Sequence, residues 1–390
     1  MSEPAVASVR LTRRGAQRWK RGHPWIFRDD VRPGAEPENG SVVAAQGPGG
    51  EPLGQGFWSA RSKIALRMIT RRADPLGRAF WGERLAAAVA YREIVARDSS
   101  ACRLVSADAD GIPGLIVDRY GPHLVIQLLI PGTEALRADL TGLACELLAP
   151  RSILARNDVA VRELEGLPRT VEQLLGETPH IVEVAEGPVR YLADLHRGQK
   201  TGAFLDQREN RLAASFYTGG RVLDLFCYHG SFALHADARA ESVVAVDSSA
   251  AALARGRENA ALNGLGRIEF VEANAFDFLK ACDRSGERFD TIFMDPPAFA
   301  KSRADVPAAK RAYKEINLRA LRILRPGGFL VTCSCSYNLS EPAFIEIIED
   351  AAADAGRRLR VVERRGASRD HPVLLGLPES RYLKCLILQA

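Results

Sequence analysis

One stretch, Arg221–Phe232, constrains the fold more than any other part of the sequence. It reads R-V-L-D-L-F-C-Y-H-G-S-F, an apolar run with Asp224 near its end, a short loop with Gly230, and a segment that can begin a helix. Strand, tight loop and helix in this order build the nucleotide-sized crevice at the strand ends of an α/β sheet. A second acid, Asp247, closes the apolar run Ser242–Val246 and lies 23 residues after Asp224. This offset suits a carboxylate that binds ribose.

The chain from Tyr191 onward alternates short apolar runs with amphipathic segments, which predicts an α/β fold with a mostly parallel sheet and helices on both faces. Helices are expected at 206–216 (capped by Asp206), 231–238, 248–263 (capped by Ser248), 275–282, 308–323 and 342–355. Strands are expected at 221–225, 242–246, 268–272, 291–294, 329–333, 359–364 and 382–388. Because two strands follow one another at the end, we expect an antiparallel edge.

The preceding half differs in pattern. Residues 8–75 hold short β-rich runs separated by glycine-rich turns, which predicts a small β module. A helix at 81–98, a hairpin of 115–120 and 124–130, a helix at 133–148 and strands at 152–156 and 181–186 predict a strand–strand–helix–strand–strand unit. The length of 390 residues favours two or three domains. We place them at 1–76, 77–190 and 191–390.

The composition is that of an ordinary globular protein, with 46% apolar and 26% charged residues. No run reaches the ~18 apolar residues of a membrane span, and the first residues do not resemble a signal peptide. Seven cysteines without a disulfide or zinc spacing predict reduced thiols, a cytoplasmic location and no metal site.

The segment from Arg10 to Arg28 contains seven Lys or Arg residues and no acid, interleaved with aromatic side chains. Cations neutralise phosphates and aromatic rings stack on bases, so this composition suits binding of a nucleic acid. A solvated surface element with ordinary core aromatics remains the alternative.

The loop after the first strand of the α/β domain lacks the G-x-G-x-x-G pattern, which disfavours a dinucleotide. An acid and one glycine fit a nucleoside cofactor with a cationic, phosphate-free tail, such as S-adenosylmethionine. Asp224 would face its ammonium group and Asp247 its ribose, and Asn274 with Ala275 could contact the adenine. Ordinary acids at strand ends are the alternative.

Two further motifs end neighbouring strands. Asp295 closes a buried strand and precedes Pro296-Pro297, where a rigidly held acid can accept a hydrogen bond from a base or simply cap a turn. The next strand ends in T-C-S-C-S, whose Cys333 and Cys335 are candidate nucleophiles, with inert buried cysteine as the alternative. If the strand persists, both cysteines point the same way.

The segment K-T-G-A-F-L-D-Q-R, 200–208, precedes the α/β domain. Gln207 and Arg208 would close the cofactor pocket, hold RNA phosphates, or merely begin a helix.

The ordered set of motifs resembles one family across nearly the whole chain. The motifs read K-T-G-A-F-L-D-Q-R, V-L-D-L-F-C-Y-H-G-S-F, M-D-P-P-A-F-A-K-S and T-C-S-C-S, with R-G-H-P-W-I-F before them and P-E-S-R-Y-L-K after them. They are similar to the RlmI-type, S-adenosylmethionine-dependent cytosine-5 methyltransferases of large-subunit ribosomal RNA. The resemblance implies a PUA β-barrel that binds RNA, a small central α+β domain and a Rossmann-like class I methyltransferase domain with a seven-stranded sheet.

By this resemblance Cys335 attacks carbon 6 of a flipped cytosine, and Asp295 holds the base. Cys335 is preferred because it stands in the S-C-S that the family shares, whereas Cys333 is an additional cysteine that could replace or assist it. The base that removes the carbon-5 proton and the oligomeric state, a homodimer included, stay open. The expected cofactor residues are Gln207, Arg208, Asp224, Phe226, Tyr228, Gly230, Asp247, Asn274, Ala275 and Asp295. The expected RNA-binding residues are Arg13, Arg14, Lys20, Arg21, His23, Trp25, Lys200 and Lys301.

Two rivals remain. The D-P-P-A-F loop also resembles the acid-Pro-Pro-aromatic loop of enzymes that methylate amino groups, and relatives that methylate guanine N7 share a K-T-G-x-F-L-D-x-R element. The second rival is an RNA-binding assembly factor, in which the transferase fold has lost its activity.

Overall fold

The computed structural model describes residues 7–73 and 75–390, which form two compact units. The first unit contains residues up to 182, 193–205 and 369–380, and the second contains 183–192, 206–368 and 381–390. Among the described residues, no helix has both the length and the apolar composition needed to cross a membrane.

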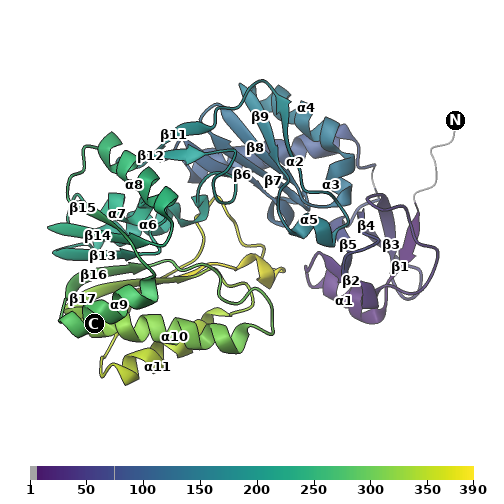
Figure 1. The fold of residues 1–390 in the computed structure, drawn as a ribbon. Coiled ribbons are helices and arrows are strands. Elements are labelled where there is room, and N and C mark those ends of the chain that lie inside the picture. The colour runs from purple at the N-terminus through teal and green to yellow at the C-terminus, as the bar shows by residue number, and fades with distance from the viewer. Residues whose placement is uncertain (1–6, 74) are drawn as a thin grey trace. The chain divides into compact units, whose positions relative to one another are not determined.

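The first unit contains two five-stranded sheets (Figure 1). The N-terminal sheet has the order β1-β3-β4-β5-β2. Its strands are β1 (Ser8–Arg10), β2 (Trp25–Phe27), β3 (Val42–Gln46), β4 (Pro52–Trp58) and β5 (Ile64–Thr70), with helix α1 (Arg13–Lys20) between β1 and β2. Thr12 caps α1, because its side-chain oxygen accepts a hydrogen bond from the backbone N–H of Gly15.

The second sheet has the order β10-β9-β8-β7-β6. Its elements are α2 (Arg78–Val95), β6 (Ala101–Ser106), β7 (Leu115–Tyr120), β8 (His123–Leu128), α3 (Pro131–Ala135), α4 (Arg137–Leu148), β9 (Ser152–Arg156), α5 (Val161–Leu164) and β10 (Val171–Leu175). The expected hairpin is confirmed as β7–β8, and the strand expected at 152–156 is confirmed as β9. The sheet also contains two strands that were not predicted, β6 and β10, and the fourth expected strand, at 181–186, lies outside it. Strand β6 contains Cys102 and Arg103, which interrupt the alternation, and β10 is a half-exposed edge strand with weak patterning. Strands β11 (Ile181–Glu186) and β12 (Val189–Asp194) form a separate hairpin.

The second unit contains a seven-stranded sheet of order β15-β14-β13-β16-β17-β19-β18. Its strands are β13 (Arg221–Leu225), β14 (Ser242–Asp247), β15 (Ile268–Glu272), β16 (Phe289–Met294), β17 (Leu324–Ser334), β18 (Arg360–Arg365) and β19 (Lys384–Gln389). Its helices are α6 (Arg208–Phe216), α7 (Ser231–Ala236), α8 (Ala250–Leu262), α9 (Ala275–Ser285), α10 (Val306–Ile323) and α11 (Glu341–Asp354). The predicted mostly parallel sheet is confirmed.

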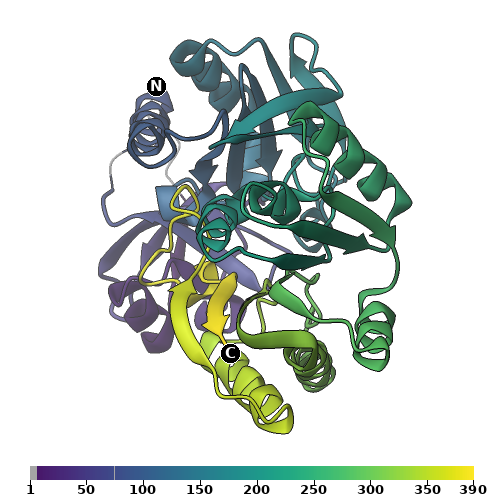
Figure 2. The same cartoon turned by 90° about the vertical axis from the view of Figure 1, so that its left-hand side faces the viewer.

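The predicted antiparallel edge is confirmed. Strand β19 lies between β17 and β18 and runs antiparallel to both, and the two C-terminal strands lie side by side at one edge of the sheet, yellow in Figure 2. Strand β19 is apolar on both faces, so it belongs inside the sheet, whereas β18 carries three arginines and is largely exposed. Helix α8 is capped by Ser249, not Ser248, since the Ser249 hydroxyl accepts from the N–H of Ala252.

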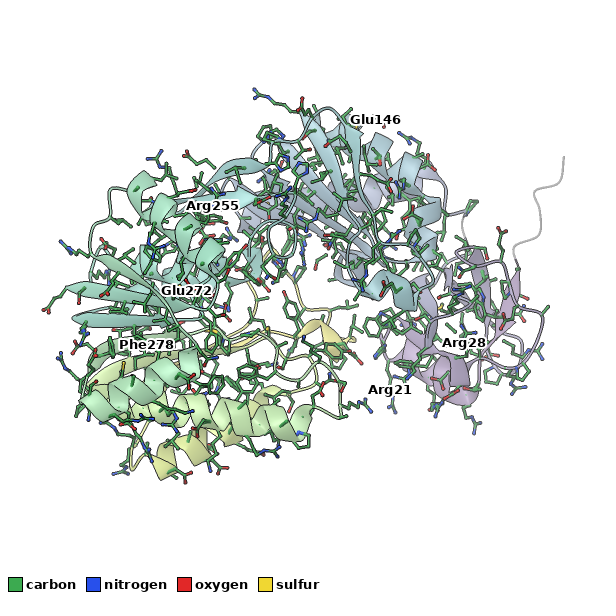
Figure 3. All side chains as sticks on the ribbon, in the orientation of Figure 1. Arg21, Arg28, Glu146, Arg255, Glu272 and Phe278 are labelled. Atoms are coloured by element: carbon green, nitrogen blue, oxygen red, sulfur yellow. The ribbon has the colours of Figure 1, made fainter. Side chains whose placement is uncertain are left out.

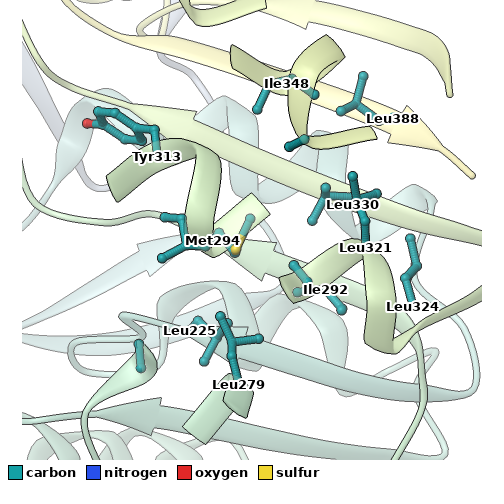
Figure 4. Packing of buried hydrophobic residues seen from close by; sticks show 14 of the residues in the cluster. Leu225, Leu279, Ile292, Met294, Tyr313, Leu321, Leu324, Leu330, Ile348 and Leu388 are labelled. Atoms are coloured by element: carbon teal, nitrogen blue, oxygen red, sulfur yellow. The ribbon is translucent and has the colours of Figure 1, made fainter. Parts of the chain in front are cut away.

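Helices cover both faces of this sheet because successive side chains of each buried strand point to opposite sides. On β16 and β17, Ile292 and Leu330 pack among α9, α10 and α11, while Phe293 and Val331 pack among α6, α7 and α8. Figure 4 shows the first of these cores, with Leu279, Tyr313 and Ile348 against the strands. The candidate site lies at the C-terminal ends of β13, β14, β16 and β17, where polar residues lie at or next to the end of each strand.

Candidate active site

The loop that follows β13 has an unusual backbone. Phe226 and Tyr228 have positive φ angles of 61° and 51°, a conformation that L-residues seldom adopt, and Gly230 has φ 80°. The loop is tied to the next strand by a hydrogen bond of 3.1 Å from the N–H of Cys227 to the carbonyl of Val246. Backbone strain of this kind persists where surrounding contacts enforce it and is frequent at ligand sites.

Asp224 lies almost completely buried at the end of β13. One of its carboxylate oxygens accepts a 2.9 Å hydrogen bond from the backbone N–H of Ala233, in the first turn of α7. Burial raises the pKa of Asp224 well above its ordinary value, and the nearby carboxyl groups of Asp295 and Asp247 raise it further. A cationic ligand would relieve this repulsion, so the site fits the ammonium and sulfonium of S-adenosylmethionine.

Asp247 ends β14 and is held by two backbone donors. Its Oδ2 accepts 2.9 Å from the N–H of Tyr228, and its Oδ1 accepts 2.9 Å from the N–H of Ser249. One of these bonds therefore comes from the loop after β13 (residues 226–230, the cofactor loop). The carboxylate oxygens keep further lone pairs that can accept hydrogen bonds from hydroxyl groups. This arrangement suits a ribose.

The other expected cofactor residues lie in different settings. Asn274 caps α9, where its Oδ1 accepts 2.9 Å from the N–H of Phe276, and Ala275 lies in the core. Gln207 and Arg208 are both buried at the start of α6, and Gln207 accepts 2.6 Å from the amide nitrogen of Asn210. These residues therefore stay predictions as ligands of the cofactor.

Asp295 follows β16, beside the cofactor loop. Its backbone N–H contacts the carbonyl of Leu225 at 3.4 Å, so the Asp-Pro-Pro segment starts next to the end of β13. The parallel register pairs Leu225 with Met294, the residue before Asp295. The structure thus brings Asp224, Asp247 and Asp295 to one edge of the sheet.

The two cysteines of T-C-S-C-S lie in different environments. Cys333 is 1% exposed, lies opposite Cys385 in the register of β17 and β19, and packs in the core. A hydrogen bond with Cys385 and burial raise its pKa well above the ordinary value of a thiol. Strand β17 ends at Ser334, so the strand does not persist to Cys335, which is half-buried with its Sγ 3.8 Å from the carbonyl oxygen of Pro296. The seven cysteines all lie within the described residues, and none of them forms a disulfide.

Contacts that the sequence did not reveal hold the loop of Cys335. The hydroxyl of Ser336 accepts 3.1 Å from the N–H of Ala300 and contacts the Tyr313 hydroxyl at 2.9 Å. The ammonium of Lys384, on β19, donates to the carbonyl oxygen of Ser336 at 2.6 Å. One charged residue within the apolar run L-K-C-L-I-L was the signal that could have revealed Lys384.

A buried ionic cluster beneath the cofactor loop was also missed. Each carboxylate oxygen of Glu186 accepts a hydrogen bond of 2.6 Å from the Arg211 guanidinium. One of these oxygens also lies 3.0 Å from Nε2 of His235. Burial alone would raise the pKa of Glu186, but the charge of Arg211 and the bond to His235 lower it below its ordinary value. These residues come from β11, α6 and α7, so no local sequence pattern links them.

The same hairpin supports the cofactor loop directly. Tyr191 of β12 stacks on the ring of His229 with ring centres 5.2 Å apart. The Asn259 amide joins β12 to the loop, because its oxygen accepts 2.8 Å from the N–H of Leu192 and its nitrogen donates 3.1 Å to the carbonyl of His229. Burial lowers the pKa of His229 to about 4, so its ring is neutral at physiological pH.

Most of the expected RNA-binding residues lie on α1, on β2 or in the short connection between them, where Arg21 is labelled in Figure 3. Arg13, Arg14, Lys20 and Arg21 are exposed, with Arg14 paired to Asp30. By contrast, the Trp25 indole donates 3.1 Å to Asp108, and His23 pairs with Glu379 at 3.2 Å, so both have internal partners. Lys200 contacts the ring of Phe204, and Lys301 is an exposed residue of the second unit.

Comparisons with known proteins identify the families that this sequence resembles. A family model described as S-adenosylmethionine-dependent methyltransferase matches residues 130–387, and one described as PUA-like domain matches residues 9–71. Ribosomal RNA large subunit methyltransferase I of Aeromonas hydrophila subsp. hydrophila is 41% identical over 98% of this chain and 99% of its own. The protein of the same name from Shewanella amazonensis is 40% identical over 94% and 95%.

Two solved structures share the fold at 21% identity, each covering 99% of this chain and 100% of its own. A Streptococcus mutans protein described as a SAM-dependent methyltransferase has a TM-score of 0.85, and a methyltransferase complexed with S-adenosylhomocysteine has a TM-score of 0.87. The family model and the relatives give one conclusion: the chain belongs to the family of S-adenosylmethionine-dependent methyltransferases that includes the proteins named ribosomal RNA large subunit methyltransferase I.

Proposed function

We propose that the protein methylates carbon 5 of a cytosine in large-subunit ribosomal RNA and that Cys335 is its nucleophile. The observation that carries this proposal is the position of Cys335, a half-buried thiol just beyond the end of β17 and beside the Asp295-Pro296 segment. The names of the relatives support ribosomal RNA as the substrate. Cys333 lacks these features, because it lies in the core opposite Cys385.

The chemistry requires a thiol because carbon 5 of cytosine is a poor nucleophile. The Cys335 thiolate attacks carbon 6, so an S–C bond forms and an electron pair moves into the ring, which makes carbon 5 nucleophilic. S-adenosylmethionine supplies the electrophilic methyl group. A base then removes the proton of carbon 5, and that electron pair restores the ring double bond as the S–C bond breaks and the thiolate is released.

Asp295 and the N-terminal module have supporting roles in this proposal. Asp295 holds the N3 and amino edge of the base and stabilises the covalent adduct. The target cytosine must leave its stack to reach a thiol at a sheet edge. The arginines and lysines of α1 bind RNA through phosphates, which contributes affinity without reading the base sequence.

Methylation of a base nitrogen is the main rival, because the Asp295-Pro-Pro-Ala-Phe loop also suits an amino group. A base nitrogen can be methylated without covalent activation, so methylation of nitrogen does not explain why a thiol lies beside the Asp295-Pro296 segment. An inactive RNA-binding assembly factor is the second rival. Calorimetry tests the premise of the enzyme hypothesis, because no binding of S-adenosylmethionine at millimolar concentration would reject it and favour this rival.

The direct test uses the purified protein, S-adenosylmethionine with a labelled methyl group and large-subunit ribosomal RNA from a strain that lacks the gene. Nucleoside analysis by mass spectrometry should recover the label in 5-methylcytidine, and bisulfite sequencing should locate it. Label recovered only in an N-methylated nucleoside would refute the proposal and support the rival.

A further inference from the structure

Lys384 occupies a position that is unusual for a lysine. It begins β19 opposite Ser334 of β17 and is only 3% exposed, and the four residues that follow it, Cys385–Leu388, are fully buried. A lysine is seldom buried unless a partner compensates for the lost hydration of its charge. The partners of Lys384 therefore indicate what it does.

Both hydrogen-bond partners of the Lys384 ammonium group are main-chain carbonyls. It donates 2.6 Å to the oxygen of Ser336 and 2.8 Å to the oxygen of Tyr382. Ser336 is the residue after Cys335, so the cation is anchored to the peptide that carries the thiol. Carbonyls supply hydrogen bonds without a negative charge, so the positive charge of Lys384 is not cancelled by them.

The charged groups around this position come from several elements. Cys335 and Glu341, at the start of α11, are the groups whose negative charge acts on Lys384. Two further ionisable groups interact with the cysteines of this loop, Tyr313 of α10 and Asp295 after β16. Burial raises the pKa of Tyr313 and the charge of Cys335 adds to this rise, while Asp295 contributes to the raised pKa of Cys333. Burial lowers the pKa of Lys384 to about 8, while Cys335 and Glu341 oppose this shift. Lys384 is thus a cation bound to the residue after Cys335 and close enough to the thiol for the two charges to interact.

We propose that Lys384 is a positioning residue for Cys335, which it serves by fixing the peptide after the thiol and by stabilising the thiolate with its charge. This inference rests on the proposed role of Cys335 as nucleophile. A lysine that only filled a buried hole would hold the loop but leave the acidity of the thiol unchanged. An opposite charge within ~4–6 Å changes a pKa by about 1–3 units, so the two roles differ measurably.

The experiment measures the rate at which iodoacetamide alkylates Cys335 as a function of pH, read by peptide mass spectrometry with Cys335→Ala as the blank. In Lys384→Met the midpoint should rise by at least about one pH unit, whereas Lys384→Arg should keep it. Methyl transfer by Lys384→Met should fall about tenfold at neutral pH and recover as pH rises. Lys314→Met, which removes an exposed lysine paired with Asp354 on α10 and α11, is the matched control and should change neither readout.

Melting temperature and S-adenosylmethionine affinity establish that each variant folds, and Lys384→Gln replaces Lys384→Met if the latter does not. An unchanged midpoint in the folded neutral variant overturns the inference, as does an equal shift in Lys384→Arg. These outcomes are separate from the proposed function, because a shifted midpoint together with full activity of Cys335→Ala would uphold the effect of Lys384 on the thiol and reject Cys335 as nucleophile.

Discussion

Two loops at the same edge of the seven-stranded sheet are held in opposite ways. Around the loop after β13, the carboxylates of Asp224 on β13 and Asp247 on β14 accept hydrogen bonds from backbone N–H groups. In the loop after β17, the Lys384 ammonium donates to a backbone carbonyl. The first loop is therefore surrounded by acidic groups, which suits a cationic cofactor, and the second is bound by a cation, which suits a reactive thiol.

The largest effect is expected from the second loop. Cys335→Ala should reduce methyl transfer by at least ~10³-fold, because without the thiol carbon 5 is not activated. Affinity for S-adenosylmethionine, measured by calorimetry, should remain within about twofold because the first loop is untouched. Cys333→Ala is the matched control and should stay active. The reverse result, an active Cys335→Ala and an inactive Cys333→Ala, would transfer the role to Cys333.

The support beneath the first loop is tested by Glu186→Gln. Glu186 has a lowered pKa in the folded state, so its stabilising effect is present above the unfolded pKa and is lost as pH falls through the folded pKa. At neutral pH the substitution removes the carboxylate that binds the buried Arg211 with both oxygens and should lower the free energy of unfolding by about 3–5 kcal/mol. Urea denaturation measures this change.

Glu183→Gln supplies the control, because it breaks the exposed pair of Glu183 and Arg190 on the same hairpin and should change stability by about 0–1 kcal/mol. Similar losses in the two variants would contradict a structural role of the buried cluster.

Asp224→Asn separates cofactor binding from stability. The pKa of Asp224 is raised, so the group favours folding below its unfolded pKa, and this contribution is lost as pH rises through the folded pKa. Removing the charge should weaken S-adenosylmethionine about 100-fold. It should also raise the melting temperature of the cofactor-free protein, with a difference that grows toward alkaline pH. Calorimetry and thermal scans measure the two effects, and a variant that loses both affinity and stability would contradict this account of Asp224.

The smallest effects concern the basic helix α1, which belongs to neither loop. Replacing Arg13, Arg14 and Lys20 by glutamine should weaken RNA binding several-fold and flatten its dependence on salt concentration, because fewer counterions are released. S-adenosylmethionine affinity and the alkylation profile of Cys335 should not change. Binding titrations across a range of salt concentrations decide this, and a salt dependence as steep as that of the unchanged protein would exclude α1 as an RNA contact.

The first loop was more accessible to sequence reasoning than the second. Asp224, Gly230 and Asp247 sit in local strand–loop patterns, so their positions at the sheet edge followed from the alternation of strands and helices. The separation of Cys333 from Cys335 depends on where β17 ends, and strand ends are poorly marked in sequence. Lys384 reaches Ser336 only through the insertion of β19 between β17 and β18, and Glu186 reaches Arg211 and His235 through packing of distant segments. Such contacts are set by tertiary structure and leave no local pattern.

The central claim is that Cys335 forms a covalent bond with the target cytosine. The most direct measurement incubates the protein and S-adenosylmethionine with ribosomal RNA that contains 5-fluorocytosine, whose carbon 5 carries fluorine in place of the proton that must leave. The account predicts an adduct that survives denaturing electrophoresis, carries the transferred methyl group, maps to Cys335 by peptide sequencing and is absent with Cys335→Ala. No adduct from a protein that methylates unmodified RNA, or an adduct at another residue, would contradict it.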